Sequence, residues 1–237
     1  MTAATARVMR DDDLPLTVAG VGLLPFCDGT LYWPDERMLI VADLHFEKGS
    51  AYATRGTFLP PYDTAATLLK LARRIALTDP RTVVTLGDNF HDRAGGERLS
   101  DRDRETIRTL QKGRDWIWIN GNHDPEPQDG LGGTWCEMLS IGPLVLRHEP
   151  TPGRAPGELA GHLHPAARVR GRQGSVRRPC FAGDGERLVL PSFGALTGGL
   201  DVHDRAFSPL FDRDALTVWL LGRDRVYGVS GRRLGTG

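Results

Sequence analysis

Gly121-Asn122-His123-Asp124 is the stretch that decides the fold, because it places an amide, an imidazole and a carboxylate directly after a short apolar run. That run, residues 115–119, reads Asp-Trp-Ile-Trp-Ile, and its β-branched and aromatic side chains predict a buried strand. The polar residues therefore follow the C-terminal end of a strand. In open α/β sheets ligands bind at that edge, although an Asn-His-Asp turn followed by proline also ends strands that bind nothing.

Two further apolar runs end in polar residues nearer the N-terminus. Residues 38–42 are apolar at every position and precede Asp43-Leu44-His45, and residues 82–86 precede Gly87-Asp88. Strands that are apolar throughout are typical of parallel sheets, in which both faces are covered. We therefore expect three buried strands that end at one edge of the same sheet.

The segments between these strands have helical patterns. Asp63 is a candidate N-cap for a helix, and we expect its buried face to hold the apolar residues Ala65, Leu68, Leu69, Ala72, Ile75 and Ala76. Ser100, with Asp103 three residues later, predicts the start of a second helix, and Gly113 predicts its end. This alternation of strands and helices predicts a parallel sheet with crossover helices.

The rest of the chain is rich in predicted strands. Residues 16–42 contain two turn compositions and predict a β-meander that ends in the first buried strand. In the second half, short apolar runs lead into His148 and into Gly161-His162-Leu163-His164. A hairpin turn is expected at residues 183–185, and a closing strand pair at residues 216–221 and 225–229.

Composition bounds the function without deciding it. Thirty basic and thirty acidic residues cancel, so any attraction to nucleic acid must be local. Three cysteines without paired spacing indicate reduced thiols and a cytoplasmic protein. We expect residues 1–13, which end in three aspartates, to be a disordered tail and residues 14–237 to form a single domain of two stacked sheets. No apolar run reaches the length of about 20 residues that spans a bilayer.

Ligand-type side chains gather at the strand ends. The set that we expect to meet at the sheet edge comprises Asp43, His45, Asp88, Asn122, His123, His148, His162 and His164. Nitrogen and oxygen donors without cysteine suit divalent Mn²⁺, Fe²⁺ or Zn²⁺. Any one of these pieces alone is more often a turn or a buried structural histidine, but ligand-type residues at five separate strand ends predict a metal site.

The number and spacing of the donors indicate two ions. Asp43 and His45, and likewise His162 and His164, are one residue apart. On extended backbone this spacing puts both side chains of a pair on one face, where both reach one ion. One ion does not need seven ligands, whereas two ions about 3.5 to 4 Å apart that share a carboxylate and a water use them all. Asp88 is the natural bridge.

The motifs, taken in order, resemble those of a known family. Asp43-Leu44-His45, Gly87-Asp88, residues 121–124, His148 and residues 161–164 are similar to the five motifs of the calcineurin-like metallophosphoesterases. A closer resemblance, to the bacterial ligase-associated DNA damage response metallophosphoesterases of the PdeM type, is carried by residues 32–34, 41–49, 59–63, 87–92 and 190–199. The resemblance covers residues 16–202. It implies an α/β fold, a four-layer α/β/β/α sandwich of two stacked mixed sheets.

The resemblance also implies roles for individual residues. One metal would be held by Asp43, His45, Asp88 and His164, and the other by Asp88, Asn122, His148 and His162. His123 would be the non-ligand histidine beside the scissile phosphate. The family pattern is usually Gly-Asp-x-x-Asp, but here His91 occupies the second acidic position and Asp92 follows. His91, Asp92 and Asp124 therefore remain three candidates for the group that orients His123.

The subfamily resemblance implies a manganese-dependent DNA phosphodiesterase or endonuclease in DNA repair. It implies association with an ATP-dependent DNA ligase, a helicase and an exonuclease-like nuclease, with DNA, single-stranded by our expectation, as substrate. Physically, two divalent ions lower the pKa of a bridging water from 15.7 towards about 7, which provides hydroxide at neutral pH. His123 can then protonate the leaving alkoxide.

The basic residues after His164 bear on the substrate. Five arginines lie between residues 168 and 178, and we take Arg177 and Arg178 as candidate substrate contacts, because such a cluster can neutralise the phosphates of a polynucleotide. A solvated loop has the same composition, and arginine clusters also bind small phosphates. A small-molecule phosphatase, a nucleotide pyrophosphatase and a non-catalytic scaffold are therefore the alternatives.

Overall fold

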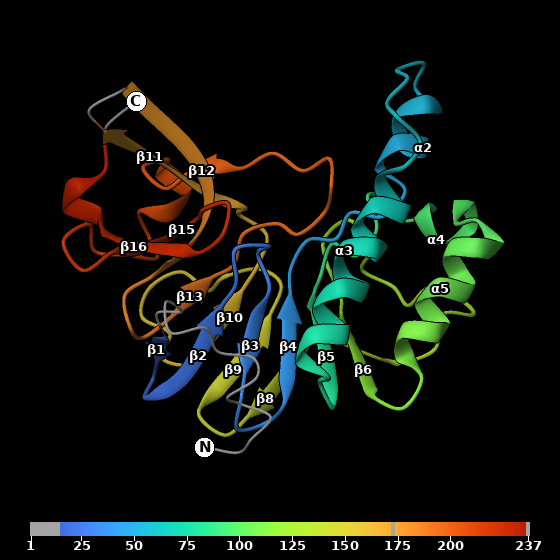
Figure 1. Ribbon diagram of the computed structural model, residues 1–237, viewed down its shortest axis with the longest axis horizontal. Helices are drawn as coiled ribbons and strands as arrows, with labels where there is room; N and C mark the ends of the chain where they lie inside the picture. The colour runs from blue at the N-terminus through green and yellow to red at the C-terminus, as the bar shows by residue number, and fades with distance from the viewer. Residues whose placement is uncertain (1–14, 172–173, 236–237) are drawn as a thin grey trace.

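The computed structural model describes residues 15–171 and 174–235, so the tail expected over residues 1–13 lies outside the described residues. Two mixed sheets, of seven and nine strands, stack against each other, which confirms the expected α/β sandwich (Figure 1). Apolar side chains from both sheets meet in one core between them, such as Ile40 and Val84 from the first sheet and Leu146 and Phe181 from the second. The sheets therefore fix each other's position.

The first sheet has its seven strands in sequence order and contains the three strands that organise the site. Its strands are β1 (Leu16–Val18), β2 (Val21–Pro25), β3 (Leu31–Trp33), β4 (Met38–Val41), β5 (Thr82–Leu86), β6 (Asp115–Ile119) and β7 (Thr134–Cys136). The strands β1 to β4 pair antiparallel, which confirms the predicted meander. The strands β4 to β7 pair parallel, which confirms the predicted parallel sheet.

The α-helices of the described residues all belong to the first half of the chain. They are α2 (Lys48–Ala53), α3 (Asp63–Thr78), α4 (Gly95–Arg98) and α5 (Asp101–Gln111). The hydroxyl of Ser100 accepts a 3.1 Å hydrogen bond from the backbone N–H of Asp103, which confirms the predicted cap of α5. Gly113 has a φ of 77° just beyond that helix, as a helix-ending glycine should.

The predicted start and buried face of α3 are wrong. Tyr62 occupies the N-cap position, and Asp63 lies in the first turn, where its carboxylate accepts from the Gly49 N–H at 3.1 Å. Ala65, Leu69 and Ala76 are exposed, and of the expected face only Leu68 and Ile75 are buried. The core side of α3 instead holds three threonines with Leu68, Leu71 and Ile75.

Threonine is tolerated on this buried face because its hydroxyl has a hydrogen-bond partner, which for two of the three lies within the helix. The Thr67 hydroxyl donates to the Asp63 carbonyl at 2.8 Å, and the Thr78 hydroxyl donates to the Arg74 carbonyl at 2.9 Å. A satisfied hydroxyl leaves the methyl group free to pack against the sheet. Because the prediction treated only apolar residues as buried, it placed the buried face of α3 at the wrong position around the helix axis.

The second sheet is built from the second half of the chain. Its strands are β8 (Met138–Ile141), β9 (Leu144–Arg147), β10 (Glu158–Ala160), β11 (Pro165–Gly171), β12 (Gly174–Gly183), β13 (Leu188–Val189), β14 (Leu200–Asp201), β15 (Thr217–Leu221) and β16 (Val226–Ser230). β12 and β13 pair antiparallel around the predicted turn at residues 183–185, and β15 pairs with β16 as the predicted closing pair. The outer face of this sheet is covered by residues around the 3-10 helix η1 (Arg205–Phe207), with no α-helix among the described residues.

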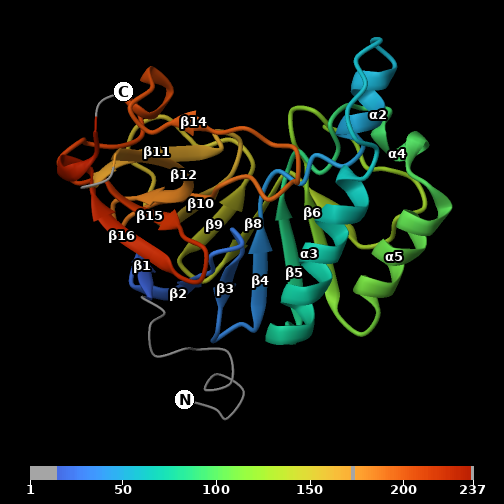
Figure 2. The ribbon, with the colours of Figure 1, turned by 45° about the horizontal axis from the view of Figure 1, so that its top comes forward.

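The strands β4, β5, β6, β9 and β10 all end near one edge of the stacked sheets. Figure 2 shows that α2 rises on one side of this edge and that β11 and β12 rise on the other. The strand ends therefore form the floor of a site with a projecting element on each side.

Within the part of the chain that the structure describes, no helix is long and apolar enough to cross a membrane.

Candidate metal centre

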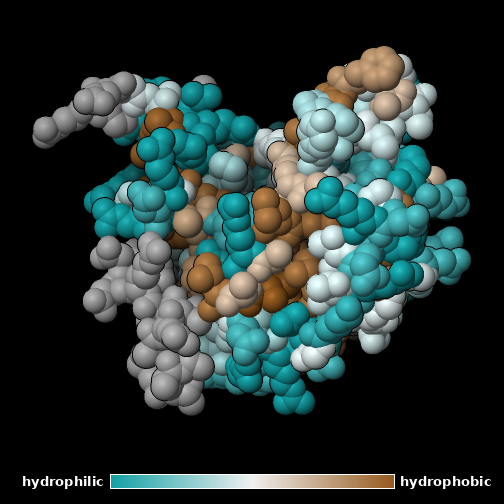
Figure 3. All heavy atoms as spheres, turned by 45° about the vertical axis from the view of Figure 1, so that its right-hand side comes forward, coloured by the Kyte–Doolittle hydropathy of each residue, from teal (hydrophilic) through white to brown (hydrophobic). Residues whose placement is uncertain are grey.

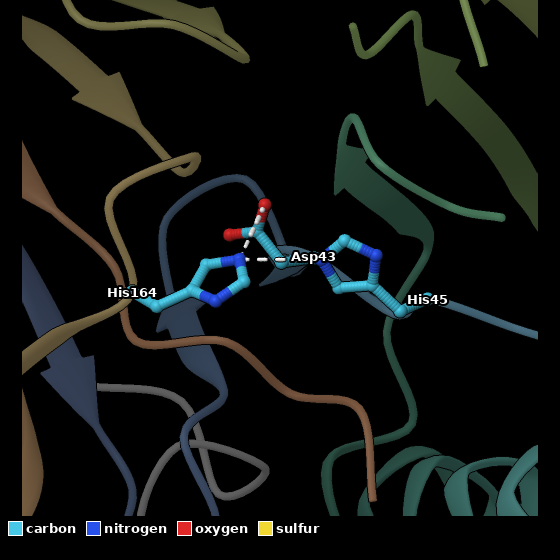
Figure 4. Close-up of side chains that lie close together, drawn as sticks. All are labelled: Asp43, His45 and His164. Carbon is cyan, nitrogen blue, oxygen red and sulfur yellow. Dashed lines mark hydrogen bonds and ion pairs between the residues drawn. The ribbon is translucent and has the colours of Figure 1, made fainter. Parts of the chain in front are cut away.

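Six of the predicted ligands meet in two clusters at this edge. One cluster contains Asp43, His45 and His164, and the other contains Asp88, His148 and His162. Within each cluster the nearest ligand atoms all lie within 4.8 Å of one another. Figure 4 shows the first cluster, in which both imidazoles lie beside the Asp43 carboxylate. The two sheets contribute jointly, because Asp43 and His45 follow β4 and His164 precedes β11.

The expectation of extended backbone through the two ligand pairs is wrong. Asp43 and His45 have φ values of 54° and 46°, and His162 and His164 have values of 69° and 46°, all in the left-handed region. His162 and His164 consequently belong to different clusters, so they do not reach one ion as the spacing suggested. Asp43 and His45 do share a cluster.

Hydrogen bonds to neighbouring strand ends, in the same sheet and in the other sheet, stabilise these strained turns. The backbone N–H of His162 donates to both carboxylate oxygens of Asp43 at 3.1 Å, and that of His45 donates to the Asp88 carbonyl at 2.9 Å. Left-handed backbone costs a non-glycine residue about 1 to 2 kcal/mol. Such strain is found at functional sites, where the surrounding structure maintains it.

The first cluster is arranged for a cation. His45 Nε2 lies 3.3 Å from His164 Nε2, and His164 Nε2 lies 3.3 Å from Asp43 Oδ1. Burial lowers the pKa of His45 to about 3, which Asp43 only partly offsets, so this imidazole is neutral at pH 7. Burial alone would raise the pKa of Asp43, but the neighbouring imidazoles of His164, His148 and His45 hold it below its usual range.

The second cluster includes the amide of Asn122. The Asn122 Oδ1 atom lies 2.9 Å from both His148 Nε2 and His162 Nδ1, and those two nitrogens are 3.2 Å apart. His148 Nδ1 donates to the Leu86 carbonyl at 2.8 Å, so its Nε2 lone pair faces the cluster. A backbone carbonyl on the second ring nitrogen is the usual support of a metal-binding histidine.

Asp88 lies between the clusters. Its Oδ1 atom is 3.3 Å from His148 Nε2 in the second cluster, and its Oδ2 atom is 3.8 Å from His45 Nε2 in the first. The Oδ1 atom also accepts a 3.0 Å hydrogen bond from the backbone N–H of His123. This position suits a carboxylate that bridges two ions.

The residues fit two divalent ions. Asp43 and Asp88 are 0% and 2% exposed, and carboxylates that are so deeply buried need a positively charged partner. The imidazole nitrogens and the Asn122 oxygen converge at 2.9 to 3.3 Å, and the buried Nδ1 atom of His45 has no hydrogen-bond partner in the described structure. Nitrogen and oxygen lone pairs at such distances repel one another unless a proton or a cation lies between them. Mixed nitrogen and oxygen donors of this kind suit Mn²⁺, Fe²⁺ or Zn²⁺.

His123 stands outside both clusters and is oriented by a main-chain group. Its Nδ1 atom donates to the carbonyl oxygen of His91 at 2.7 Å, and its Nε2 atom lies 3.8 Å from Asp88 Oδ2. The His91 ring stacks on the His123 ring with centroids 5.4 Å apart and planes 25° apart. Of the three candidates for the orienting group, His91 alone contacts the His123 ring among the described residues.

The two candidate carboxylates have structural partners instead. Asp124 accepts from the backbone N–H groups of Asn89, Phe90 and Gly121 at 3.0, 3.3 and 3.2 Å, which ties the β5 and β6 loops together. Asp92 accepts from Arg98 Nη2 at 2.8 Å and from the Ala94 N–H at 3.1 Å. Neither carboxylate therefore orients the histidine directly.

Sequence reasoning missed Tyr52 and the glycines before the ligands. The Tyr52 ring of α2 stacks on His91 at 5.5 Å, and no pattern in the sequence indicates this contact. A Cβ atom on Gly121 would lie 2.0 Å from the Asp88 nitrogen, and one on Gly161 would lie 2.7 Å from Asp43 Oδ2. The repeated order of glycine followed by a ligand, at positions 87, 121 and 161, was the available signal.

The two candidate substrate arginines lie on opposite faces of one hairpin. Arg177 pairs with Arg168 in the antiparallel register of β11 and β12, and Arg178 pairs with Ala167. Neighbouring residues of a strand point to opposite faces. Arg177 donates to the Gly199 carbonyl, next to Leu200, whose N–H donates to the His164 carbonyl at 2.9 Å. Arg177 is therefore close to the metal centre.

Comparison with known proteins decides the family. A family model described as calcineurin-like phosphoesterase matches residues 36–186, which is most of the chain and includes all residues of the two ligand clusters. The chain belongs to the calcineurin-like phosphoesterase family. A calcineurin-like phosphoesterase hydrolyses phosphoric esters.

Two solved structures were compared with this calcineurin-like phosphoesterase. The nuclease MPE of Pseudomonas putida is 32% identical, with a TM-score of 0.71, over 92% of this chain and 100% of that one. The phosphoesterase Yfce of E. coli is 15% identical, with a TM-score of 0.42, over 81% of this chain and 98% of that one. The second likeness is too weak to carry an argument. No curated protein sequence matches the chain at a significant level.

Proposed function

We propose that this calcineurin-like phosphoesterase is a metal-dependent phosphodiesterase that cleaves DNA internally. The observation that carries the proposal is the position of His123, whose Nε2 atom faces the carboxylate that lies between the two ligand clusters. An oriented, non-ligand imidazole at that point can donate a proton to the leaving oxygen of a phosphodiester. The likeness to a nuclease of Pseudomonas putida supports a polynucleotide as the substrate.

The residues divide the work of hydrolysis. One ion would be held by Asp43, His45, Asp88 and His164, and the other by Asp88, Asn122, His148 and His162. When bound, two divalent ions supply an acidified water and neutralise the phosphate oxygens.

His123 would supply the proton for the leaving group. Because its Nδ1–H is engaged with the His91 carbonyl, Nε2 is the nitrogen that delivers a proton. General acid catalysis of this kind is worth about 10² to 10⁴-fold in rate.

The basic hairpin supports a polymeric substrate. Arg168, Arg170 and Arg177 lie on one face of β11 and β12, while the whole chain has no net charge. Arg177 is next to the loop that holds His164, so a phosphate bound at the metal centre would have a cation on its flank. Neutralising neighbouring phosphates in this way is how proteins bind a nucleic acid backbone.

Finer properties rest on the subfamily resemblance, and we propose them on that basis. They are Mn²⁺ as the native metal, a role in DNA repair, and association with an ATP-dependent DNA ligase, a helicase and an exonuclease-like nuclease. The sequence has three cysteines without paired spacing, which supports a reducing, cytoplasmic location. We also propose that residues 14–237 act as one domain, because each sheet contributes ligands to the first cluster.

The decisive experiment offers the purified protein several phosphoric esters. Circular single-stranded DNA, linear duplex DNA, mononucleotides and phosphate monoesters are each incubated with Mn²⁺, Mg²⁺, Zn²⁺ or Ca²⁺, with Asp88→Asn as the inactive control. We expect Mn²⁺-dependent cutting of the circular DNA, which requires an internal break. Hydrolysis of monoesters or nucleotides without any cutting of DNA would identify a small-molecule phosphatase or pyrophosphatase instead.

A further inference from the structure

A projecting segment beside the metal centre presents aromatic side chains to solvent. We call residues 48–62 the arm. It consists of α2 and the connection to α3, and Figure 1 shows α2 standing clear of the sheets. Phe58 and Tyr62 are 87% and 70% exposed, the highest values for large hydrophobic side chains in the described chain. Figure 3 shows this apolar projection at one corner, with the surface hollowed between it and the opposite side.

The base of the arm is firmly attached. Thr64 Oγ1 donates to the Glu47 carboxylate at 2.9 Å and accepts from the Glu47 N–H at 2.9 Å. The Asp63 carboxylate accepts from the Gly49 N–H at 3.1 Å. These bonds close the two ends of the arm on each other, so the base from which its aromatic side chains project is fixed.

The arm adjoins the reacting groups. Tyr52 of the arm stacks on His91, which stacks on His123, with ring centroids 5.5 and 5.4 Å apart. A ligand that leaves the metal centre on this side therefore reaches the arm first. Residues 48–62 contain no carboxylate, while Lys48 and Arg55 give the arm positive charge, which favours a polyanion.

The basic hairpin lies on the other side of the centre. Figures 1 and 2 both place β11 and β12 opposite α2. Arg168 and Arg177 are directly opposite each other in the hairpin register, and like charges so placed are destabilising in a sheet. Among the described residues, no carboxylate forms an ion pair with either of them. An anion bound between them would remove the repulsion.

We propose that the arm is a stacking platform for the unpaired bases of a single-stranded nucleic acid whose phosphates lie against the hairpin arginines. The inference rests on the proposed phosphodiesterase function and names the subsite that selects its substrate. Exposed aromatic rings stack on bases of any sequence, but the paired bases of a duplex are not available to them. Phe58 and Tyr62 each provide such a ring, and the preference for single strands follows from their exposure.

The test measures binding apart from catalysis. A fluorescent oligothymidylate of 20 nucleotides is titrated with metal-free protein and followed by anisotropy, with an oligouridylate and a duplex of equal length in parallel. Loss of one stacked base weakens binding about 5- to 150-fold. We expect a loss of at least tenfold for Phe58→Ala with Tyr62→Ala on either single strand, and no loss for Phe58→Trp.

A matched control keeps the test specific. Leu77 of α3 is 69% exposed, so Leu77→Ala removes a comparable apolar side chain away from the centre and should bind like the wild type. All variants should hydrolyse the small diester bis(p-nitrophenyl) phosphate at the wild-type rate, because that substrate is too short to reach the arm.

Two results would overturn the assignment of the arm. One is an unchanged affinity of the double variant for both single strands. The exposed rings would then be assigned to contact with a protein partner and not with nucleic acid. The other is an equal loss of affinity for the duplex. Failure of the wild type to hydrolyse the small diester with any metal would instead contradict the proposed function, and the two failures are separate measurements.

Discussion

At the turn of residues 121–124 three adjacent polar side chains have three different partners. Asn122 faces two imidazoles of the second cluster, His123 donates to the His91 carbonyl, and Asp124 binds backbone N–H groups of two loops. The sequence predicts that this turn meets the other strand ends, because buried apolar runs precede all of them. It cannot predict that a carbonyl rather than a carboxylate orients His123, because every residue has a carbonyl group and the sequence does not show which one a side chain contacts.

The left-handed backbone at the ligand residues was also beyond sequence reasoning. A positive φ is expected for glycine, yet Asp43, His45, Asp88, His162 and His164 all adopt it. Hydrogen bonds between segments that are distant in sequence stabilise these turns, such as those of the His162 N–H with Asp43 and of the His45 N–H with Asp88. Spacing rules for extended strands therefore assign His162 and His164 to the same ion, although the folded chain separates them.

Replacement of Asp124 tests its structural role. Asp124→Ala leaves three buried N–H groups without an acceptor, and we expect the free energy of unfolding to fall by about 2 to 4 kcal/mol. Burial raises the pKa of Asp124 to about 7 against these hydrogen bonds, so a neutral acceptor is tolerated and Asp124→Asn should lose less. Urea denaturation measures both variants. An Asn variant as unstable as the Ala variant would contradict this account.

Replacement of Gly161 tests the close approach of the two sheets. The added Cβ atom of Gly161→Ala would lie 2.7 Å from Asp43 Oδ2 and 3.1 Å from the Leu86 carbonyl oxygen, so a ligand must move. We expect a loss of about 1 to 3 kcal/mol in stability and weaker metal binding. Thermal unfolding and metal analysis measure the two effects.

Gly22→Ala is the matched control, because a Cβ atom there meets nothing within 4 Å. If Gly161→Ala retained metal as well as Gly22→Ala does, the packing at Asp43 would not be as tight as the distances indicate.

At the scale of the elements, strands were predictable and helix faces were not. The strands β4, β5 and β6 are apolar runs whose burial follows from composition. The start of α5 is predictable because the Ser100 side chain caps it. The core face of α3 was mispredicted because three of its buried residues are threonines. Sequence patterns predict burial correctly where the polarity of the side chain determines whether it is buried. They fail for a threonine whose hydroxyl bonds to a carbonyl of its own helix.

Helix α2 contributes to the site through one ring. Tyr52→Ala removes the ring that covers His91, and an aromatic pair is worth about 0.5 to 1.5 kcal/mol. We expect kcat for a thymidine dinucleotide, whose alkoxide leaving group needs a proton, to fall about three- to tenfold, because the His91 and His123 rings lose their support, while bound metal stays unchanged. Tyr52→Phe should restore the rate, since Tyr52 acts through its ring. Equal rates for the Ala variant and the wild type would exclude a positioning role.

At the scale of the whole molecule, the site depends on the stacking of two sheets. The strand order β14-β11-β12-β13-β10-β9-β8 of the second sheet departs from sequence order and depends on pairings between distant segments. The sequence could therefore indicate two stacked sheets but not which ligands each would deliver. Because the clusters take residues from both sheets, metal binding and the stability of the stack should be coupled.

The position of bound ions tests the central claim most directly. Crystals grown with Mn²⁺ should show two anomalous diffraction peaks per chain, one beside Asp43, His45 and His164 and the other beside Asn122, His148 and His162, with Asp88 in contact with both. A single peak, or one peak ligated by both His162 and His164, would contradict a dinuclear centre bridged by Asp88.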